Sequence, residues 1–271
     1  MHKIALYCKS FSRDLTRVAL LWKSIQKFNV DKIPFFVSVP RHEVHLFEEI
    51  VSSGAVVLAD EDLAGDPGRL RQDWSTQQII KQKFGLSGLC ENYLCLDSDS
   101  YFIRPFGVDD FIVPGTNICY TVMHEQKELF GYTINKTHQL GFDPIESFKR
   151  DRYKVMDVFG REGRIYDFGP APVLWNCDVW KSFETDYLKP NNLTFIDCIR
   201  MVPSEFTWYG EFLLADRTID IRPIEPIFKV FHYIGQYQEA KAAGYKTDDF
   251  AKIYSGFVMQ GNAMNMPLTF D

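Results

Sequence analysis

Apolar and polar residues alternate along the first hundred positions in a regular order of short strands and longer helices. Four continuous apolar runs have the length of buried strands, at residues 3–8, 33–39, 55–58 and 93–96. Helical spacing of apolar residues is found between them, at 15–28, 43–51 and 70–84, and the polar stretch 60–68 is predicted to be a loop. Strands that alternate with helices favour βαβ units and a mainly parallel sheet, whose ligands lie beyond the carboxyl ends of the strands.

This order is lost after residue 106. The second half is predicted to contain a strand at 117–123, irregular chain at 124–166, a strand within 190–199, a helix at 204–215 and extended chain at 219–230. Few periodic signals follow Gly256. Because the chain has neither an internal repeat nor a low-complexity linker, we expect one domain over residues 1–271, with a nucleotide-binding half at 1–106.

Composition excludes several classes of protein. The 30 basic residues against 36 acidic ones give a net charge of −6, so the chain lacks the basic surplus of a nucleic-acid binder. With 46% apolar residues it can bury a core, which excludes wholesale disorder. No run is long and apolar enough for a membrane-spanning helix, although peripheral membrane association stays open. The scattered cysteines and the start of the chain, which lacks the pattern of a signal peptide, predict a cytoplasmic protein with reduced thiols.

The strongest chemical signal is the segment LCLDSDSYFIRPF at residues 94–106, where an apolar strand runs into two aspartates. In extended chain the side chains of Asp97 and Asp99 share one face, and Ser98 points the other way. Two hard oxygen ligands on one face suit a divalent cation that also holds a diphosphate. The alternative is a solvated acidic turn.

A second signal is His232, which follows an apolar run and precedes Gly235 by three residues. Imidazole binds Mn²⁺ well beside carboxylates and Mg²⁺ less well. A histidine among aromatic residues is also commonly a buried core residue, and the sequence leaves both interpretations open.

A strand followed by Asp-Ser-Asp, with a late His-x-x-Gly, resembles the GT-A glycosyltransferases. This resemblance implies a GT-A-like α/β fold, with an irregular acceptor-binding half at 107–271, and the transfer of a sugar from a nucleotide-sugar donor to a glycan or other hydroxyl acceptor. It further implies that Asp97, Asp99 and His232 bind Mn²⁺ or Mg²⁺. Surface-polysaccharide biosynthesis is the setting that the family suggests.

The resemblance also assigns residues to the donor. Binding of the nucleotide and its sugar is expected from the loop after the first strand, the helix before the acidic pair, the pair itself and the segment 167–176: Tyr7, Ser10, Arg13, Arg71, Gln77, Lys81, Ser98 and Trp175. Each of these residues also has an ordinary structural explanation, as a polar loop, a solvated helix face or a buried tryptophan.

An inverting GT-A enzyme needs a carboxylate base that faces the acceptor hydroxyl. Glu205 lies in the first helical turn if Ser204 is the N-cap, and the helix dipole would hold it ionised. Glu205 is therefore the first candidate for the base of an inverting reaction, followed by Glu211 and Asp178.

Three other functions stay open. An aspartyl phosphatase also uses Asp-x-Asp after a strand, but it places the pair on the first strand. A sugar-nucleotide nucleotidyltransferase opens with a glycine-rich loop, whereas residues 9–14 read KSFSRD. A non-catalytic carbohydrate-binding protein would suit the 15% aromatic content.

Overall fold

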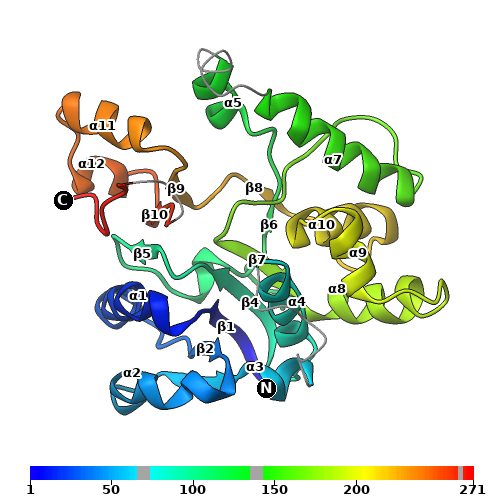
Figure 1. Ribbon diagram of the computed structural model, residues 1–271, viewed down its shortest axis with the longest axis horizontal. Coiled ribbons are helices and arrows are strands. Elements are labelled where there is room, and N and C mark those ends of the chain that lie inside the picture. The colour runs from blue at the N-terminus through cyan, green and yellow to red at the C-terminus, as the bar shows by residue number, and fades with distance from the viewer. Residues whose placement is uncertain (66–73, 135–142, 262–264) are drawn as a thin grey trace.

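The computed structural model describes residues 1–65, 74–134, 143–261 and 265–271, and its centre is a five-stranded sheet (Figure 1). The strands are β1 (His2–Lys9), β2 (Phe35–Val39), β3 (Val56–Ala59), β4 (Cys90–Leu96) and β7 (Val173–Asn176). Their order is β3-β2-β1-β4-β7, in which β7 is antiparallel to β4 and the other four strands are parallel. The predicted α/β class with a mainly parallel sheet is confirmed.

The helices pack around this sheet. In the first half they are α1 (Leu15–Phe28), α2 (Glu48–Ser52), α3 (Asp60–Ala64) and α4 (Trp74–Gly85), with 3-10 turns at Ser12–Asp14, Arg41–Phe47 and Val108–Asp110. In the second half they are α5 (Lys127–Ile134), α7 (Pro144–Val158), α8 (Cys177–Ser182), α9 (Phe195–Met201), α10 (Glu205–Asp216), α11 (Ile234–Ala242) and α12 (Thr247–Ala251), with a π-helical turn at Phe183–Leu188. Among the described helices, none is both long and apolar enough to cross a membrane.

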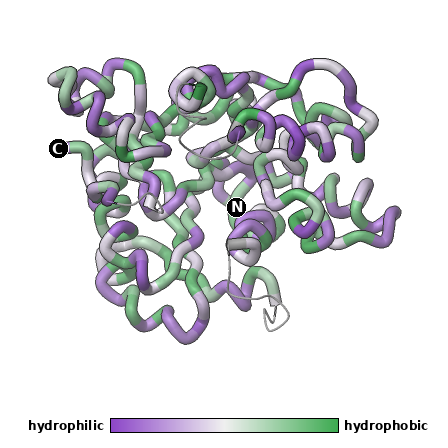
Figure 2. Tube along the Cα trace, turned by 45° about the horizontal axis from the view of Figure 1, so that its top comes forward, coloured by the Kyte–Doolittle hydropathy of each residue, from purple (hydrophilic) through white to green (hydrophobic). Residues whose placement is uncertain are grey.

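Strand β1 shows how the sheet separates two layers of the core. Alternate residues of a strand point to opposite faces. Leu6 packs with the apolar face of α1, whereas Tyr7 packs with residues of α4 and α8. In Figure 1, α1 lies to the left of the sheet and α4 to its right. The helices in Figure 2 carry both hydrophilic and hydrophobic stretches, as expected of helices that bury one side.

Two smaller sheets complete the second half. β5 (Ser100–Phe102), β10 (Gly256–Met259) and β9 (Phe228–Phe231) form one sheet in the order β5-β10-β9, and β6 (Thr121–Val122) pairs with β8 (Pro223–Ile224). β5 begins directly after the acidic pair, and β10 pairs with it antiparallel. The C-terminal part of the chain therefore lies beside Asp99.

Several predictions about elements were wrong, because local capping outweighed weak periodicity. The expected loop at 60–68 begins with helix α3, whose first turn carries three acidic residues that favour a helix N-terminus. The expected irregular chain at 124–166 contains α5 and α7, and Asp143 caps α7 through the N–H groups of Ile145 and Glu146. The strand expected within 190–199 is replaced by α9, capped by a Thr194–Asp197 capping box. The helix after Ser204 forms as predicted.

Candidate functional site

A cavity of about 640 Å³ lies at the carboxyl ends of β1 and β4. Its lining includes Asp97, Ser98, Asp99, Arg13, Gln77, Lys81 and Glu205, all proposed from the sequence, and also Lys9, Phe11, Asp14, Arg17, Pro170, Ala171, Phe206, Gln260 and Gly261. The sheet topology explains the location, because parallel strands that end together leave a crevice at that edge.

Asp99 lines this cavity with a largely buried carboxylate. Its Oδ2 accepts a hydrogen bond of 2.6 Å from the backbone N–H of Gly261 and lies 3.8 Å from a guanidinium nitrogen of Arg17. Its Oδ1 is buried and lacks a hydrogen-bond partner among the described residues. Burial, and after it the nearby charge of Asp97, raises the pKa of Asp99 to about 7. The site therefore contains an unbound acceptor oxygen, Asp99 Oδ1, and two carboxylates whose negative charges repel each other.

These two properties fit a divalent cation held by Asp97 and Asp99, because a cation satisfies the spare oxygen and offsets the repulsion. Within the described part of the chain, no third histidine, cysteine or acidic side chain joins them in a metal-binding group. The protein ligands that could hold such a cation are thus the two carboxylates.

Lys81 connects the acidic pair to the start of α10. Its Nζ lies 2.8 Å from Asp97 Oδ1 and 3.1 Å from Glu205 Oε1. Burial alone would lower the pKa of Lys81, but the two carboxylates raise it well above its usual value. Burial raises the pKa of Glu205, and Lys81 opposes that shift. The side chain of Glu205 is 3% exposed, and its carboxylate thus serves first as the partner of a buried lysine.

Lys9 and Phe11 form the wall of the cavity nearest β1, and the sequence analysis did not single them out. Lys9 Nζ lies 3.0 Å from Asp60 Oδ2 at the start of α3 and 3.6 Å from the centre of the Phe11 ring. Burial lowers the pKa of Lys9, and Asp60 opposes the shift. Arg17 was missed as well; its position one helical turn after Arg13 was the available signal. The contact of Gly261 with Asp99 joins residues 162 positions apart, and no local pattern announces it.

His232 does not join the acidic pair. It follows β9, and in the sheet β10 separates β9 from β5, the strand that begins next to Asp99. Its ring instead lines a second cavity. Burial lowers the pKa of His232 to about 4, so that its imidazole is neutral near pH 7.

Three residues expected to bind the donor lie inside the protein. Tyr7 is fully buried in β1, where its ring stacks on Phe84 and its hydroxyl pairs with Ser38 Oγ at 2.7 Å. Ser10 is 1% exposed and does not line the cavity. Trp175 is 1% exposed in β7 and packs edge-on against Trp180. Arg71 lies outside the described residues.

Neither of the two other candidates for a base lines the cavity. Glu211 is fully buried, and both of its oxygens accept hydrogen bonds from the guanidinium group of Arg161. Asp178 lies in the first turn of α8, where its exposed side chain pairs with Lys181 at 2.8 Å. Both carboxylates have local structural partners, which explains their presence without any chemistry.

The fold is that of the GT-A glycosyltransferases. The galactosyltransferase LgtC, solved in complex with donor and acceptor sugar analogues, has a TM-score of 0.53 at 13% identity, over 95% of this chain and 87% of that one. Mouse xyloside xylosyltransferase 1 in its apo form has a TM-score of 0.47 at 8% identity, over 97% of this chain and 99% of that one. No curated protein matches the sequence. The model of a family of unknown function, DUF6492, matches residues 4–154, which is more than half of the chain, and the protein belongs to this family.

Proposed function

We propose that this protein is a glycosyltransferase that moves a sugar from a nucleoside diphosphate sugar to a hydroxyl group of a glycan or other acceptor. The observation that carries the proposal is the pair Asp97 and Asp99 at the end of β4, in a cavity that also holds Arg17 and Lys81. Carboxylates beside cations are what a metal-bound diphosphate needs, because the metal meets the carboxylates and the phosphate oxygens meet the cations.

In this proposal Asp97 and Asp99 hold Mn²⁺ or Mg²⁺. The bound ion would offset the negative charge of the nucleoside diphosphate leaving group. Arg17, 3.8 Å from Asp99, and Arg13 in the cavity wall would meet phosphate oxygens. Lys81 would hold Asp97 in place.

We assign the rest of the donor to the walls of the cavity. Phe11 and Phe206 offer aromatic faces, on which a nucleobase or the C–H face of a sugar can pack. Ser98 and Gln77 also line the cavity and supply hydrogen-bonding groups. Phe11 and Phe206 take the part that the sequence had suggested for Trp175.

The arrangement gives the expected inverting mechanism no support. A base that takes a proton from an acceptor hydroxyl needs a free oxygen within hydrogen-bond reach of it. The carboxylate of Glu205 is almost wholly buried and is shared with Lys81. We therefore propose that Glu205 positions Lys81, and we assign it no proton transfer.

Binding of nucleotides tests the proposal directly. We expect UDP, GDP or CDP to raise the melting temperature of the protein in the presence of Mn²⁺, and to do so much less in EDTA. We also expect slow hydrolysis of the matching nucleotide sugar when no acceptor is present. A protein that binds none of these nucleotides with Mn²⁺, and hydrolyses no nucleotide sugar, is not the enzyme proposed.

The alternatives receive less support. The acidic pair follows the fourth strand of the chain, which differs from the first-strand position in an aspartyl phosphatase. A carbohydrate-binding protein would present its aromatic residues at the surface, but most of the large ones here are buried.

All six cysteines are buried and free, which supports the proposed cytoplasmic location, and surface-polysaccharide biosynthesis stays a proposal.

A further inference from the structure

A second cavity of about 670 Å³ lies beside the first, and the proposed function leaves it unassigned. Pro170 lines both cavities. The second is bounded by α5, by β9 and by the residues around Ser255 before β10; Figure 1 shows α5 at the top and the unit of α11, α12 and β10 at the left. Its size is in the range that binds small organic ligands.

The wall next to Pro170 is held rigidly by hydrogen bonds. His124 Nε2 lies 2.6 Å from the carbonyl oxygen of Gly169, and His124 Nδ1 accepts a bond of 3.3 Å from the backbone N–H of Gln126. The two ring nitrogens also lie 3.7 Å from Asp167 Oδ2 and 3.9 Å from Glu225 Oε2. Asp167 is bound by the side chains of Gln126 and Arg152, the latter at 2.7 Å. This wall is thus a fixed frame with few free groups.

Arg104 is different, because it reaches the cavity without an acidic partner. Its Nη2 donates a hydrogen bond of 3.0 Å to Ser255 Oγ, while its Nε is buried and lacks a hydrogen-bond partner among the described residues. No ion pair joins Arg104 to any acidic side chain in the described part of the chain.

The neighbouring charges are paired. Glu125 binds Lys127 at 2.9 Å and Arg164 at 2.7 Å, and Glu128 binds Lys229. The remaining acid, Glu225, is 84% exposed and is therefore well solvated at the mouth of the cavity. The guanidinium group of Arg104 is thus the uncompensated charge of the inner wall.

From this cavity and its unpaired arginine we infer that the second cavity binds the acceptor, and that the acceptor is a saccharide with an acidic group, carboxylate or phosphate, held by Arg104. The inference rests on the proposed function. A guanidinium group binds either anion through paired N–H donors. His232 and Gln236 also line the cavity. The Oε1 of Gln236 accepts hydrogen bonds from the backbone N–H groups of His232 and Tyr233, which leaves its NH₂ group and the His232 imidazole for sugar hydroxyls. Since Pro170 borders both cavities, a hydroxyl of such a ligand can reach the donor side.

Binding of simple saccharides to the full chain, with Mn²⁺ and whichever of UDP, GDP or CDP it binds, tests the inference. The probes are p-nitrophenyl β-D-glucuronide for the carboxylate, glucose 6-phosphate for the phosphate and p-nitrophenyl β-D-glucoside as the neutral control. Their binding is measured by saturation-transfer NMR. We expect one or both acidic probes to bind at least about tenfold more tightly than the glucoside. The Arg104→Gln variant should lose this preference, and Arg104→Lys should keep part of it because it retains the charge without the fork.

Arg200→Gln is the matched control, since Arg200 is exposed on α9 and lines neither cavity. Its affinity for all three probes should equal that of the unmodified chain. Equal binding of acidic and neutral probes, or a preference that survives in Arg104→Gln, would overturn the inference. The Arg104→Lys variant keeps this test valid if Arg104→Gln does not fold. If the chain binds none of UDP, GDP and CDP but binds an acidic probe through Arg104, that result would count against the proposed glycosyl transfer and not against the second cavity.

Discussion

Lys81 shows at the scale of one residue how this site keeps charge inside the protein. Its side chain is 4% exposed and lies between Asp97 and Glu205. A buried charge is tolerated only when it is paired, and removal of one partner leaves the other uncompensated. The lysine therefore contributes to the stability of the fold as well as to the geometry of the acidic pair.

The Lys81→Met variant should lose about 3 kcal/mol in its free energy of unfolding, because Glu205 is left buried without its cation. The double variant Lys81→Met with Glu205→Gln should recover part of that loss. Urea unfolding of the two single variants and the double variant measures the coupling. Strict additivity of the two single effects would contradict the pairing.

Removal of one carboxylate should weaken metal-dependent nucleotide binding. We expect Asp99→Asn to reduce the affinity for Mn²⁺, together with whichever of UDP, GDP or CDP binds the unmodified chain, by at least about tenfold, because the amide lacks the negative charge of the ligand. Asp178→Asn is the control, since Asp178 is exposed on α8. Isothermal titration calorimetry compares the variants, and unchanged affinity in Asp99→Asn would remove Asp99 from the metal site.

His232 should make the protein sensitive to acid. Its pKa is lowered to about 4 by burial, whereas an unfolded histidine titrates near 6.5. Between these two values the unfolded state binds the extra proton, so stability falls as the pH falls, by about 2 kcal/mol at pH 5. Urea unfolding at pH 7 and pH 5 should show a smaller decrease for His232→Asn than for the unmodified chain. An equal decrease in both would refute the assignment.

At the scale of elements, α10 packs against the segment that precedes β7. Gly210 lies inside α10, and a Cβ atom there would come within 2.0 Å of the Phe168 ring. Alanine favours a helix over glycine by about 1 kcal/mol, so propensity and packing oppose each other at this position. The close contact decides whether alanine at this position raises or lowers the stability, because a buried ring in a filled core cannot move away without a large cost in free energy.

The Gly210→Ala variant should therefore be destabilised by about 1–3 kcal/mol. Gly131→Ala in α5 is the matched control, because a Cβ atom at Gly131 would meet nothing within 4 Å. That variant should be as stable as the unmodified chain or slightly more stable. Thermal unfolding followed by circular dichroism compares the two, and equal effects would show that helix propensity dominates at both positions.

Most elements of the first half could be predicted because they carry their own signal, and α3, which was expected to be a loop, is the exception. The apolar periodicity of 15–28 matches α1 residue for residue, and the run at 93–96 lies within β4. The second half depends on caps and on distant partners. β10 is a four-residue strand whose partners, β5 and β9, lie elsewhere in the sequence, and short apolar runs do not reveal such pairings.

The residues of the candidate site also fall into those that local sequence predicts and those that depend on distant parts of the chain. The acidic pair is local, since two aspartates after a buried strand can be read directly, and Lys81 follows from the helix before them. Gly261, Arg17 and the separation of His232 from the pair depend on how the C-terminal sheet packs. Side chains such as Trp175 were misplaced because an aromatic residue has the same appearance in sequence whether it stacks on a sugar or fills a core.

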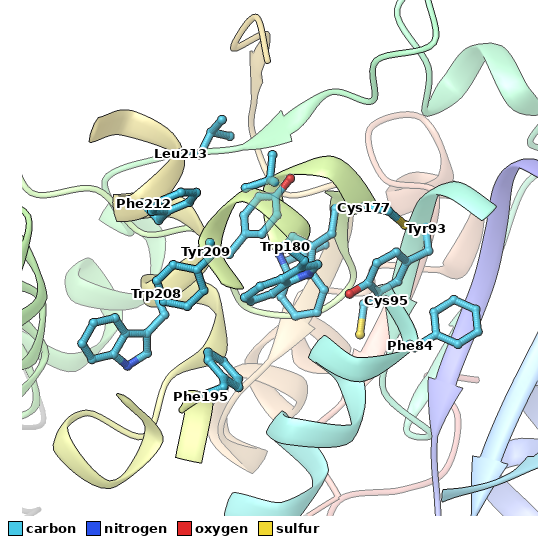
Figure 3. Close-up of a cluster of buried hydrophobic side chains, with 14 of the residues drawn as sticks. Phe84, Tyr93, Cys95, Cys177, Trp180, Phe195, Trp208, Tyr209, Phe212 and Leu213 are labelled. Carbon is cyan, nitrogen blue, oxygen red and sulfur yellow. The ribbon is translucent and has the colours of Figure 1, made fainter. Parts of the chain in front are cut away.

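For the whole molecule, the aromatic excess is now explained by packing. A large cluster between the central sheet and helices α4 and α8–α10 contains Trp180, Trp208 and Tyr209, and Figure 3 shows their rings together with Phe195 and Phe212. Aromatic side chains bury large areas and contact each other edge to face. The high aromatic content is therefore explained first by the packing of this core, to which both halves of the chain contribute.

The short strand β5 connects a residue of the first cavity, Asp99, to a residue of the second, Arg104. Asp99 precedes β5 and Arg104 lies two residues after it, so five residues of chain set the spacing between the proposed metal site and the proposed anchor for an acidic group. Extended chain spans at most ~17 Å over five residues. The fold would then select acceptors by length. Transfer should be fastest for saccharides in which one particular distance separates the acidic group from the reacting hydroxyl. Rates measured on a series of acidic oligosaccharides of increasing length should pass through a maximum, and a flat series would mean that β5 sets no such limit.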